Sequence, residues 1–148
     1  MKKTRILVLC TGNSCRSQLA HAYLEQALGT QFEVFSAGVE KHGVNPKALA
    51  VLQEDGLDCN HYTSNLVDEY SHLEFQWVLT VCDNAAERCP IFSSSAKKIH
   101  HDFKDPAKAK GSEEEIMNVF RNVRDEIKTF CFTWTDEIKQ VKIYGKDD

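Results

Sequence analysis

The chain has 148 residues, an apolar fraction of 42% and a formal net charge of -4, which fit one globular domain with one core. The negative charge argues against a nucleic-acid-binding surface. No apolar run of about 18 residues is present, which excludes a membrane-spanning helix. The apolar stretch near Met1 is too short for a signal peptide, so we expect a cytoplasmic protein. The 6 cysteines are poor candidates for structural disulfides in that reducing compartment.

The first apolar run, residues 5–9, predicts a buried parallel strand. The segment Cys10-Thr-Gly-Asn-Ser-Cys-Arg-Ser17 follows, and apolar residues at helical spacing then predict a helix over 16–28. A loop between a strand and a helix offers an anion its backbone N–H groups and the positive end of the helix. The planar guanidinium of Arg16 can bind two oxygens of that anion. The residues expected to bind an oxyanion are Thr11, Gly12, Asn13, Ser14, Cys15 and Arg16.

Cys10 is expected at the centre of this positive field, which favours its thiolate at neutral pH. A thiolate that faces a tetrahedral oxyanion is a nucleophilic enzyme site. Ser17 is placed to donate its hydroxyl proton to the Cys10 sulfur. The alternative interpretation is a buried cysteine at a strand end, followed by a loop that caps a helix.

Further elements follow in chain order, each predicted from its apolar pattern and its flanking residues. They are a strand at 32–36, a helix from 46 to 56, a short helix at 65–70, a strand at 77–81 and a weaker strand at 97–101. Asn45 and Pro46 predict the start of the second helix, because an N-cap residue before proline is a preferred beginning. Ser64 is expected to cap the short helix.

The last helix is predicted from a capping box formed by Ser112 and Glu115. Apolar residues at helical spacing then continue as far as Val141. The tail 129–148 is expected to extend this helix or to fray, with residues 145–148 loose.

Alternating strands and helices predict an α/β fold, here a single three-layer domain over residues 1–148. We expect a four-stranded parallel sheet of order 2-1-3-4, with right-handed crossovers and helices on both faces. Ligands of such sheets bind at the carboxyl ends of the strands, where the strand order reverses. The loops expected at that edge carry Cys10, Cys82 and Asp105.

A cysteine pair flanks the polar segment after the third strand. Cys82 follows the strand directly, and Cys89 stands before Pro90. The two thiols could pair if the segment brought their Cα atoms within about 6 Å. If Cys82 also reaches Cys10, the three thiols form a relay in which each thiolate attacks the previous sulfur. The alternative is two unrelated cysteines, one buried at a strand end and one incidental.

Asp105 precedes Pro106 in the loop after the fourth strand. A carboxyl group beside a bound oxyanion can protonate a departing oxygen as a general acid. The alternative is an ordinary turn, because Asp-Pro is common there. We expect no structural metal, because the cysteine spacings differ from those of zinc sites and His100 and His101 would point to opposite faces of a strand. His42 is expected in an ordinary surface or core role.

Several of these segments together resemble the thioredoxin-coupled arsenate reductases, which share the fold of the low-molecular-weight protein tyrosine phosphatases. The resemblance covers roughly residues 5 to 128. It is carried by Cys10 to Ser17, Ser36-Ala-Gly38, His42-Gly-Val-Asn-Pro46, Val81-Cys82 with Cys89-Pro90, His101 to Pro106 and Val123 to Ile127. The oxyanion loop and the cysteine pair occur together in this family, whereas the phosphatases lack the pair.

The resemblance implies a role for each site residue. Cys10 would attack arsenate, Ser17 would stabilise its thiolate, and Asp105 would protonate the leaving hydroxide while Arg16 and the loop amides hold the oxyanion. Cys82 would then attack the Cys10–arsenic adduct, releasing arsenite and leaving a Cys10–Cys82 disulfide. Cys89 would attack Cys82, leaving a Cys82–Cys89 disulfide for thioredoxin to reduce. We expect a monomer that needs no cofactor beyond these electrons.

The chain also departs from the family at a cation site. Some members bind potassium through residues that match Asn13, position 21, Ser36 and position 65. Positions 21 and 65 are carboxylates in those members, but here they are His21 and Asn65. The loss of two anionic ligands predicts poor affinity for a hard cation.

Two other functions compete with arsenate reduction. A phosphatase would use the same loop through a phosphocysteine, since phosphate and arsenate share shape and charge. The cysteine pair and the segment Ala107 to Lys110, which has no aromatic wall for a tyrosine ring, argue against it. The other alternative is a binding module that senses oxidation without catalysis. We expect at most a weak side activity on phosphate esters.

Overall fold

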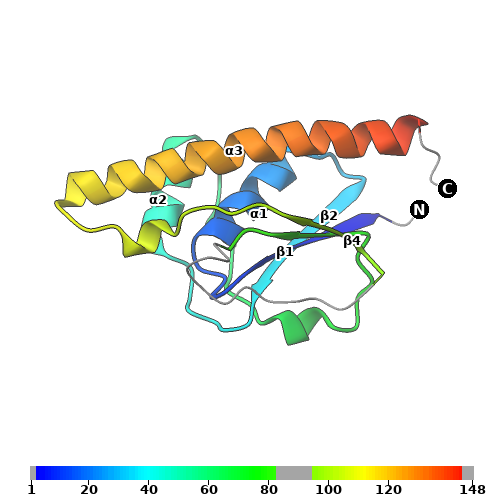
Figure 1. Ribbon diagram of the computed structural model, residues 1–148, viewed down its shortest axis with the longest axis horizontal. Helices are drawn as coiled ribbons and strands as arrows, with labels where there is room; N and C mark the ends of the chain where they lie inside the picture. The colour runs from blue at the N-terminus through cyan, green and yellow to red at the C-terminus, as the bar shows by residue number, and fades with distance from the viewer. Residues whose placement is uncertain (1–2, 83–94, 145–148) are drawn as a thin grey trace.

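The computed structural model describes residues 3–82 and 95–144, with side chains as far as residue 140. Strands and helices alternate along this part of the chain (Figure 1). The elements are β1 (Thr4–Cys10), α1 (Arg16–Ala27), β2 (Phe32–Gly38), α2 (Pro46–Glu54), the 3-10 helix η1 (Val67–Tyr70), β3 (Trp77–Thr80), β4 (Lys97–His100), the 3-10 helix η2 (Pro106–Lys108) and α3 (Glu113–Tyr144).

The four strands form one parallel sheet of order β2-β1-β3-β4, which confirms the predicted topology. Strand β1 is central and almost wholly buried, as its continuous apolar run predicts. Val8 of β1 pairs with Ser36 on one side and with Leu79 on the other. Strand β4 is an edge strand and is largely exposed, which explains its weaker pattern in the sequence.

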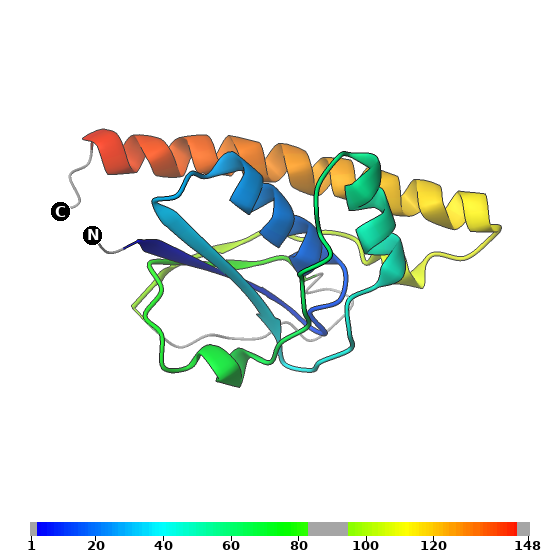
Figure 2. The ribbon, with the colours of Figure 1, turned by 180° about the vertical axis from the view of Figure 1, so that it is seen from behind.

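The two faces of the sheet carry separate cores, because successive side chains of a strand point to opposite faces. Ile6 and Val8 belong to the larger core, together with residues of α1, α2 and α3. Leu7 and Leu9 belong to the smaller core, which Phe75 and the region of η1 cover. Figures 1 and 2 show the three α-helices on one side of the sheet and η1 on the other. Helix α1 is buried between the sheet and α3.

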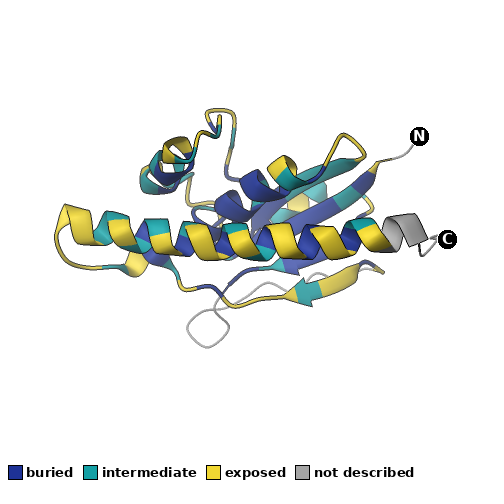
Figure 3. Ribbon diagram, turned by 90° about the horizontal axis from the view of Figure 1, so that it is seen from above, coloured by how far each residue is buried: buried dark blue, intermediate teal, exposed yellow. Residues whose placement is uncertain are grey.

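Helix α3 crosses the whole length of the molecule (Figure 2). The predicted capping box begins it, since Ser112 Oγ accepts from the N–H of Glu115 at 3.1 Å and Glu115 Oε1 accepts from that of Ser112 at 2.7 Å. Buried and exposed residues alternate along the helix (Figure 3). Its buried stripe is Phe120, Val123, Ile127, Cys131, Trp134 and Ile138. The helix continues through Thr129, and none of the described helices is long and apolar enough to cross a membrane.

The prediction that Ser64 caps the short helix is wrong. Helix η1 begins at Val67, and the backbone N–H of Leu66 donates to Glu69 Oε2 at 2.8 Å instead. The hydroxyl of Ser64 donates to the carbonyl of Gly12 at 3.2 Å. Ser64 therefore supports the loop after β1 and not the helix that follows it in the chain.

Candidate active site

The predicted oxyanion loop lies between the end of β1 and the start of α1. Cys10 is the last residue of β1, is only 2% exposed, and pairs with Gly38 at the end of β2. A Cβ atom at Gly38 would lie 2.6 Å from the carbonyl oxygen of Thr11, so the close approach of β2 to the loop requires glycine there. The strand ends therefore hold Cys10 and the loop in a fixed place.

The carbonyl groups of the loop are turned outward, away from the side of Cys10. Each of four consecutive carbonyls accepts a hydrogen bond from a neighbouring segment. The bonds are Glu40 N to Thr11 O at 3.0 Å, His42 N to Gly12 O at 3.1 Å, Gln18 Nε2 to Asn13 O at 3.0 Å and Asn45 N to Ser14 O at 3.1 Å. In a planar trans peptide the N–H points opposite to the C=O, so the amides of this loop point inward. This arrangement suits an oxyanion.

Asn13 fixes the middle of the loop. Its φ of 50° is left-handed, a conformation that asparagine tolerates better than most residues. Its Nδ2 donates to Ser17 Oγ at 2.7 Å, and its Oδ1 accepts from the N–H of Asn65 at 2.7 Å. Because Ser17 Oγ accepts this bond, its own proton remains to be donated, as the predicted role toward Cys10 requires.

Arg16 and Asp105 meet at the site. Arg16 is 4% exposed; its Nη1 donates to the carbonyl of Phe103 at 3.2 Å, and its Nη2 lies 3.5 Å from Asp105 Oδ2. Asp105 Oδ1 accepts from the N–H of Ala107 at 3.0 Å. Asp105 is thus the turn-capping residue of the alternative interpretation and also a neighbour of the loop arginine.

A cavity of about 240 Å³ opens over the loop. Its lining is Cys10, Thr11, Gly12, Ser14, Cys15, Arg16, His42, Asp105, Ala107 and Lys108. Asn13 is absent from this set, because its side chain is bonded to Ser17 and Asn65. His42 and Lys108 line the cavity although no periodic pattern in the sequence points to either. His42 reaches it because the segment after β2 crosses the loop, and Lys108 because η2 turns at Asp105.

Two cysteines of the loop have different environments. Burial raises the pKa of Cys15 to about 12, and the nearby carboxylate of Asp105 contributes to this rise. Cys15 is therefore a thiol at neutral pH. Cys10 stands at the strand end that the loop amides and Arg16 surround, which leaves it as the nucleophile of this loop.

Cys82 is brought to the same edge of the sheet. It follows β3 closely, is 0% exposed, and its thiol lies 3.9 Å from the carbonyl oxygen of Leu9, to which it donates. The N–H of Val81 donates to the same carbonyl at 3.0 Å. Leu9 directly precedes Cys10, so the second sulfur lies beside the nucleophile's strand end. Cys89 lies outside the described residues.

The residues at the family's cation site fit a hard cation poorly. Ser36 Oγ is hydrogen-bonded to His21 Nδ1 at 2.8 Å, and Asn13 Oδ1 accepts from the backbone of Asn65. Both oxygens that remain of the ligand set thus have protein partners, and His21 Nε2 pairs with Glu25 at 3.1 Å. Elsewhere in the described part of the chain, no group of three or more His, Cys, Asp or Glu is placed to hold a metal ion.

Comparisons with known proteins agree with this geometry. Residues 5–143 match the model of the low molecular weight phosphotyrosine protein phosphatase family. A protein from Halalkalibacterium halodurans named arsenate reductase is 46% identical over 137 residues, which are 90% of this chain and 99% of that protein.

Solved structures share the fold. A structure described as an arsenate reductase in the phosphate binding state has a TM-score of 0.75 at 24% identity and covers 91% of this chain and 98% of its own. A thioredoxin-dependent arsenate reductase from Corynebacterium glutamicum has a TM-score of 0.63 at 20% identity, covering 91% of this chain and 62% of its own. From the family match and the curated relative together, the chain belongs to the low molecular weight phosphotyrosine protein phosphatase family.

Proposed function

We propose that this chain reduces arsenate to arsenite with the thiols of Cys10, Cys82 and Cys89, and that thioredoxin supplies the electrons. The observation that carries the proposal is the buried Cys82 thiol on the carbonyl of Leu9, next to Cys10. A hydrolase that forms a cysteine intermediate needs only one sulfur, whereas a reductase needs a second sulfur within reach of the first. The 46% identical relative named arsenate reductase supports the same reaction.

In the first step the Cys10 thiolate attacks arsenic. The S–As bond forms and one As–O bond breaks, while arsenic remains As(V). Asp105 gives its proton to the departing hydroxide, which leaves as water. Arg16 and the inward loop amides bind the remaining oxygens throughout this step.

In the second step the sulfur of Cys82 attacks the sulfur of Cys10. The S–S bond forms, the S–As bond breaks, and the electron pair stays on arsenic, which becomes As(III). Cys89 then attacks Cys82, which releases Cys10 as a thiolate and leaves a Cys82–Cys89 disulfide. Two electrons from the dithiol match the two that arsenic gains.

Thioredoxin is the reductant of this proposal, since its own dithiol can open the Cys82–Cys89 disulfide by the same exchange chemistry. The thioredoxin-dependent enzyme of the same fold supports this choice. Such a cycle needs a reducing compartment, so we assign the chain to the cytoplasm, where it would act as a monomer.

Phosphate-ester hydrolysis is the second candidate, and the family match favours it as a side activity. The loop can hold phosphate as it holds arsenate, because the two ions share shape and charge. Among the described residues that line the cavity there is no Phe, Tyr or Trp to stack on a tyrosyl substrate. We therefore propose weak hydrolysis of small esters and no specific action on phosphotyrosine.

The test is arsenate-dependent NADPH consumption with thioredoxin and thioredoxin reductase, run beside a phosphate-ester assay. Cys89→Ser should stop multiple turnovers, yet release about one equivalent of arsenite and trap a Cys10–Cys82 disulfide. Cys82→Ser should block even that first turnover, and neither change should abolish ester hydrolysis. The control is Cys59→Ser, a buried cysteine whose thiol donates to Leu49 O, away from the cavity. Normal turnover by Cys89→Ser would show that the relay is wrong.

A further inference from the structure

A histidine forms part of the cavity wall and has no role in the steps above. His42 lines the cavity together with Cys10 and Arg16. Its ring lies directly on Gly12, where a Cβ atom would come within 2.2 Å of His42 Nδ1. Its backbone N–H also donates to the carbonyl of Gly12 at 3.1 Å. The imidazole is therefore held at the rim of the oxyanion loop by both its ring and its backbone.

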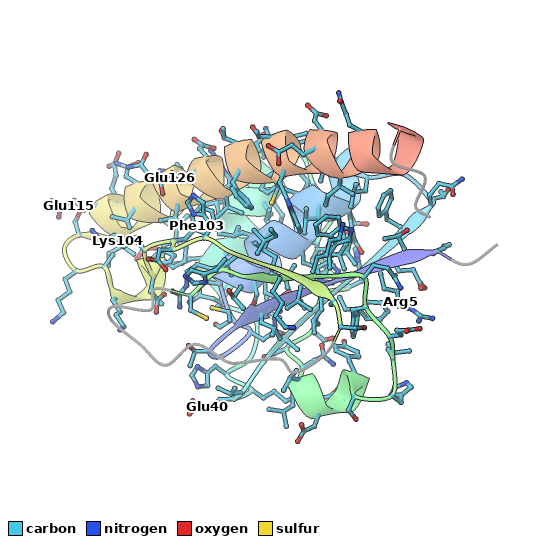
Figure 4. The ribbon with its side chains drawn as sticks, turned by 45° about the vertical axis from the view of Figure 1, so that its right-hand side comes forward. Arg5, Glu40, Phe103, Lys104, Glu115 and Glu126 are labelled. Atoms are coloured by element: carbon cyan, nitrogen blue, oxygen red, sulfur yellow. The ribbon has the colours of Figure 1, made fainter. Side chains whose placement is uncertain are left out.

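The two ring nitrogens of His42 have different surroundings. Nε2 lies 2.6 Å from Glu40 Oε1, on the loop that follows β2 at the margin of the molecule (Figure 4). Nδ1 has no hydrogen-bond partner among the residues that the structure describes. Because the carboxylate accepts the Nε2 proton, Nδ1 is the nitrogen left for a ligand, and in the imidazolium it is a donor.

The second reaction step consumes a proton that the first does not provide. The arsenic bound to Cys10 carries three oxygens with one proton and one negative charge between them, whereas neutral arsenous acid has a proton on each of its three oxygens. The Cys82 thiol brings one proton when its sulfur attacks Cys10, so one more is needed. Asp105 has already given its proton to the departing hydroxide. The oxygens also become more basic in this step, because the electron pair returns to arsenic.

We propose that His42 is a catalytic residue, the acid that protonates an oxygen of the departing arsenite in the second step. The imidazolium gives its Nδ1 proton as the S–As bond breaks, and the neutral ring is recharged from solvent. The charged groups around this ring are Glu40, paired with Nε2, and Arg16, Asp105 and Lys108 across the cavity lining. The inference rests on the proposed function. Release of phosphate in ester hydrolysis has no matching step, since the oxygens of phosphate gain no electron pair.

The test compares His42→Gln with the wild type and with His72→Gln, a change at an exposed histidine outside the cavity. Glutamine keeps a polar side chain at the rim but cannot donate a titrating proton. Reduced protein is mixed with arsenate in the absence of thioredoxin, and arsenite is measured in a single turnover across the histidine titration range. The Cys10–arsenic adduct is followed by mass spectrometry, and hydrolysis of p-nitrophenyl phosphate is measured in parallel.

We expect His42→Gln to slow arsenite release about 10²-fold or more, to remove the histidine limb of its pH profile, and to accumulate the adduct. Its hydrolysis of p-nitrophenyl phosphate should match that of His72→Gln. Equal losses in both reactions would overturn the proposal in favour of a structural role at Gly12, and an unchanged release rate would overturn it directly. If the wild type itself releases no arsenite, the proposed function fails, whereas the other outcomes leave that function standing.

Discussion

Cys10 and Cys15 belong to one loop, yet their local surroundings assign them opposite chemistry. Burial raises the pKa of Cys15 to about 12, so its thiol is inert at neutral pH. Iodoacetamide at about pH 6.5 should therefore modify Cys10 first, because thiolates and not thiols are alkylated. Phosphate should protect Cys10 by filling the loop. Peptide mass spectrometry measures the order of labelling, and equal labelling of all cysteines would contradict the assignment.

Asp105 offers a clean separation of chemistry from structure, because asparagine can keep one of its contacts. Asp105→Asn retains an oxygen that accepts from the N–H of Ala107 and caps η2. It cannot give a proton to hydroxide. Turnover should fall by about 10²–10⁴-fold, whereas the melting temperature and the affinity for phosphate should change little. A rate near that of the wild type would leave Asp105 with the turn role alone.

Three helices are joined by one small polar cluster. Tyr23 of α1 donates to Asp55 Oδ2 at 2.7 Å, and Lys128 of α3 donates to the same oxygen at 2.8 Å. Asp55 is the C-cap of α2, so its carboxylate joins α1, α2 and α3. The hydrogen bond from Lys128, followed by that from Tyr23, lowers the pKa of Asp55 in the folded protein.

Asp55→Asn should lower the free energy of unfolding by about 1–3 kcal/mol at neutral pH, since a charge-assisted bond is lost. A carboxyl whose pKa is lowered by folding stabilises the protein above its unfolded pKa, about 3.9, and this contribution disappears as pH falls through the folded value. The wild-type advantage should therefore shrink below about pH 4. Urea denaturation at several pH values measures it, with Asp136→Asn on the exposed side of α3 as the control. A constant difference across pH would exclude the linkage.

Across the whole molecule, the far half of α3 is tied to the sheet by the two tryptophans of the chain. Trp134 meets Trp77 of β3 edge to face, with ring centroids 5.8 Å apart. Trp134→Ala should cost about 3–5 kcal/mol, because it leaves a cavity between α3 and the sheet. Phe132→Ala, on the exposed side of the same helix, should cost far less. Thermal unfolding followed by fluorescence compares them, and equal costs would mean that this half of α3 does not stabilise the fold.

The sequence predicted the architecture well, because the apolar runs of β1 and β3 and the stripe of α3 are local patterns. Strand order followed from the chemistry that had to share one edge of the sheet. Ser64 was misassigned because its partner, Gly12, lies 52 residues away and nothing in the spacing relates them. His42 was missed for the same reason, since its contact with the loop depends on how the segment after β2 crosses it. The relay beyond Cys82 stays a prediction, because Cys89 lies outside the described residues.

The outward hydrogen bonds of the oxyanion loop have a consequence for engineering this protein. Residues 40 and 42 support the loop through backbone N–H groups, which every amino acid except proline possesses. Their side chains can therefore be exchanged without altering the hydrogen bonds that shape the loop. The floor of the site and the chemistry at its rim are separate modules in this respect. Libraries at these two positions would sample new oxyanion substrates on an unchanged cradle.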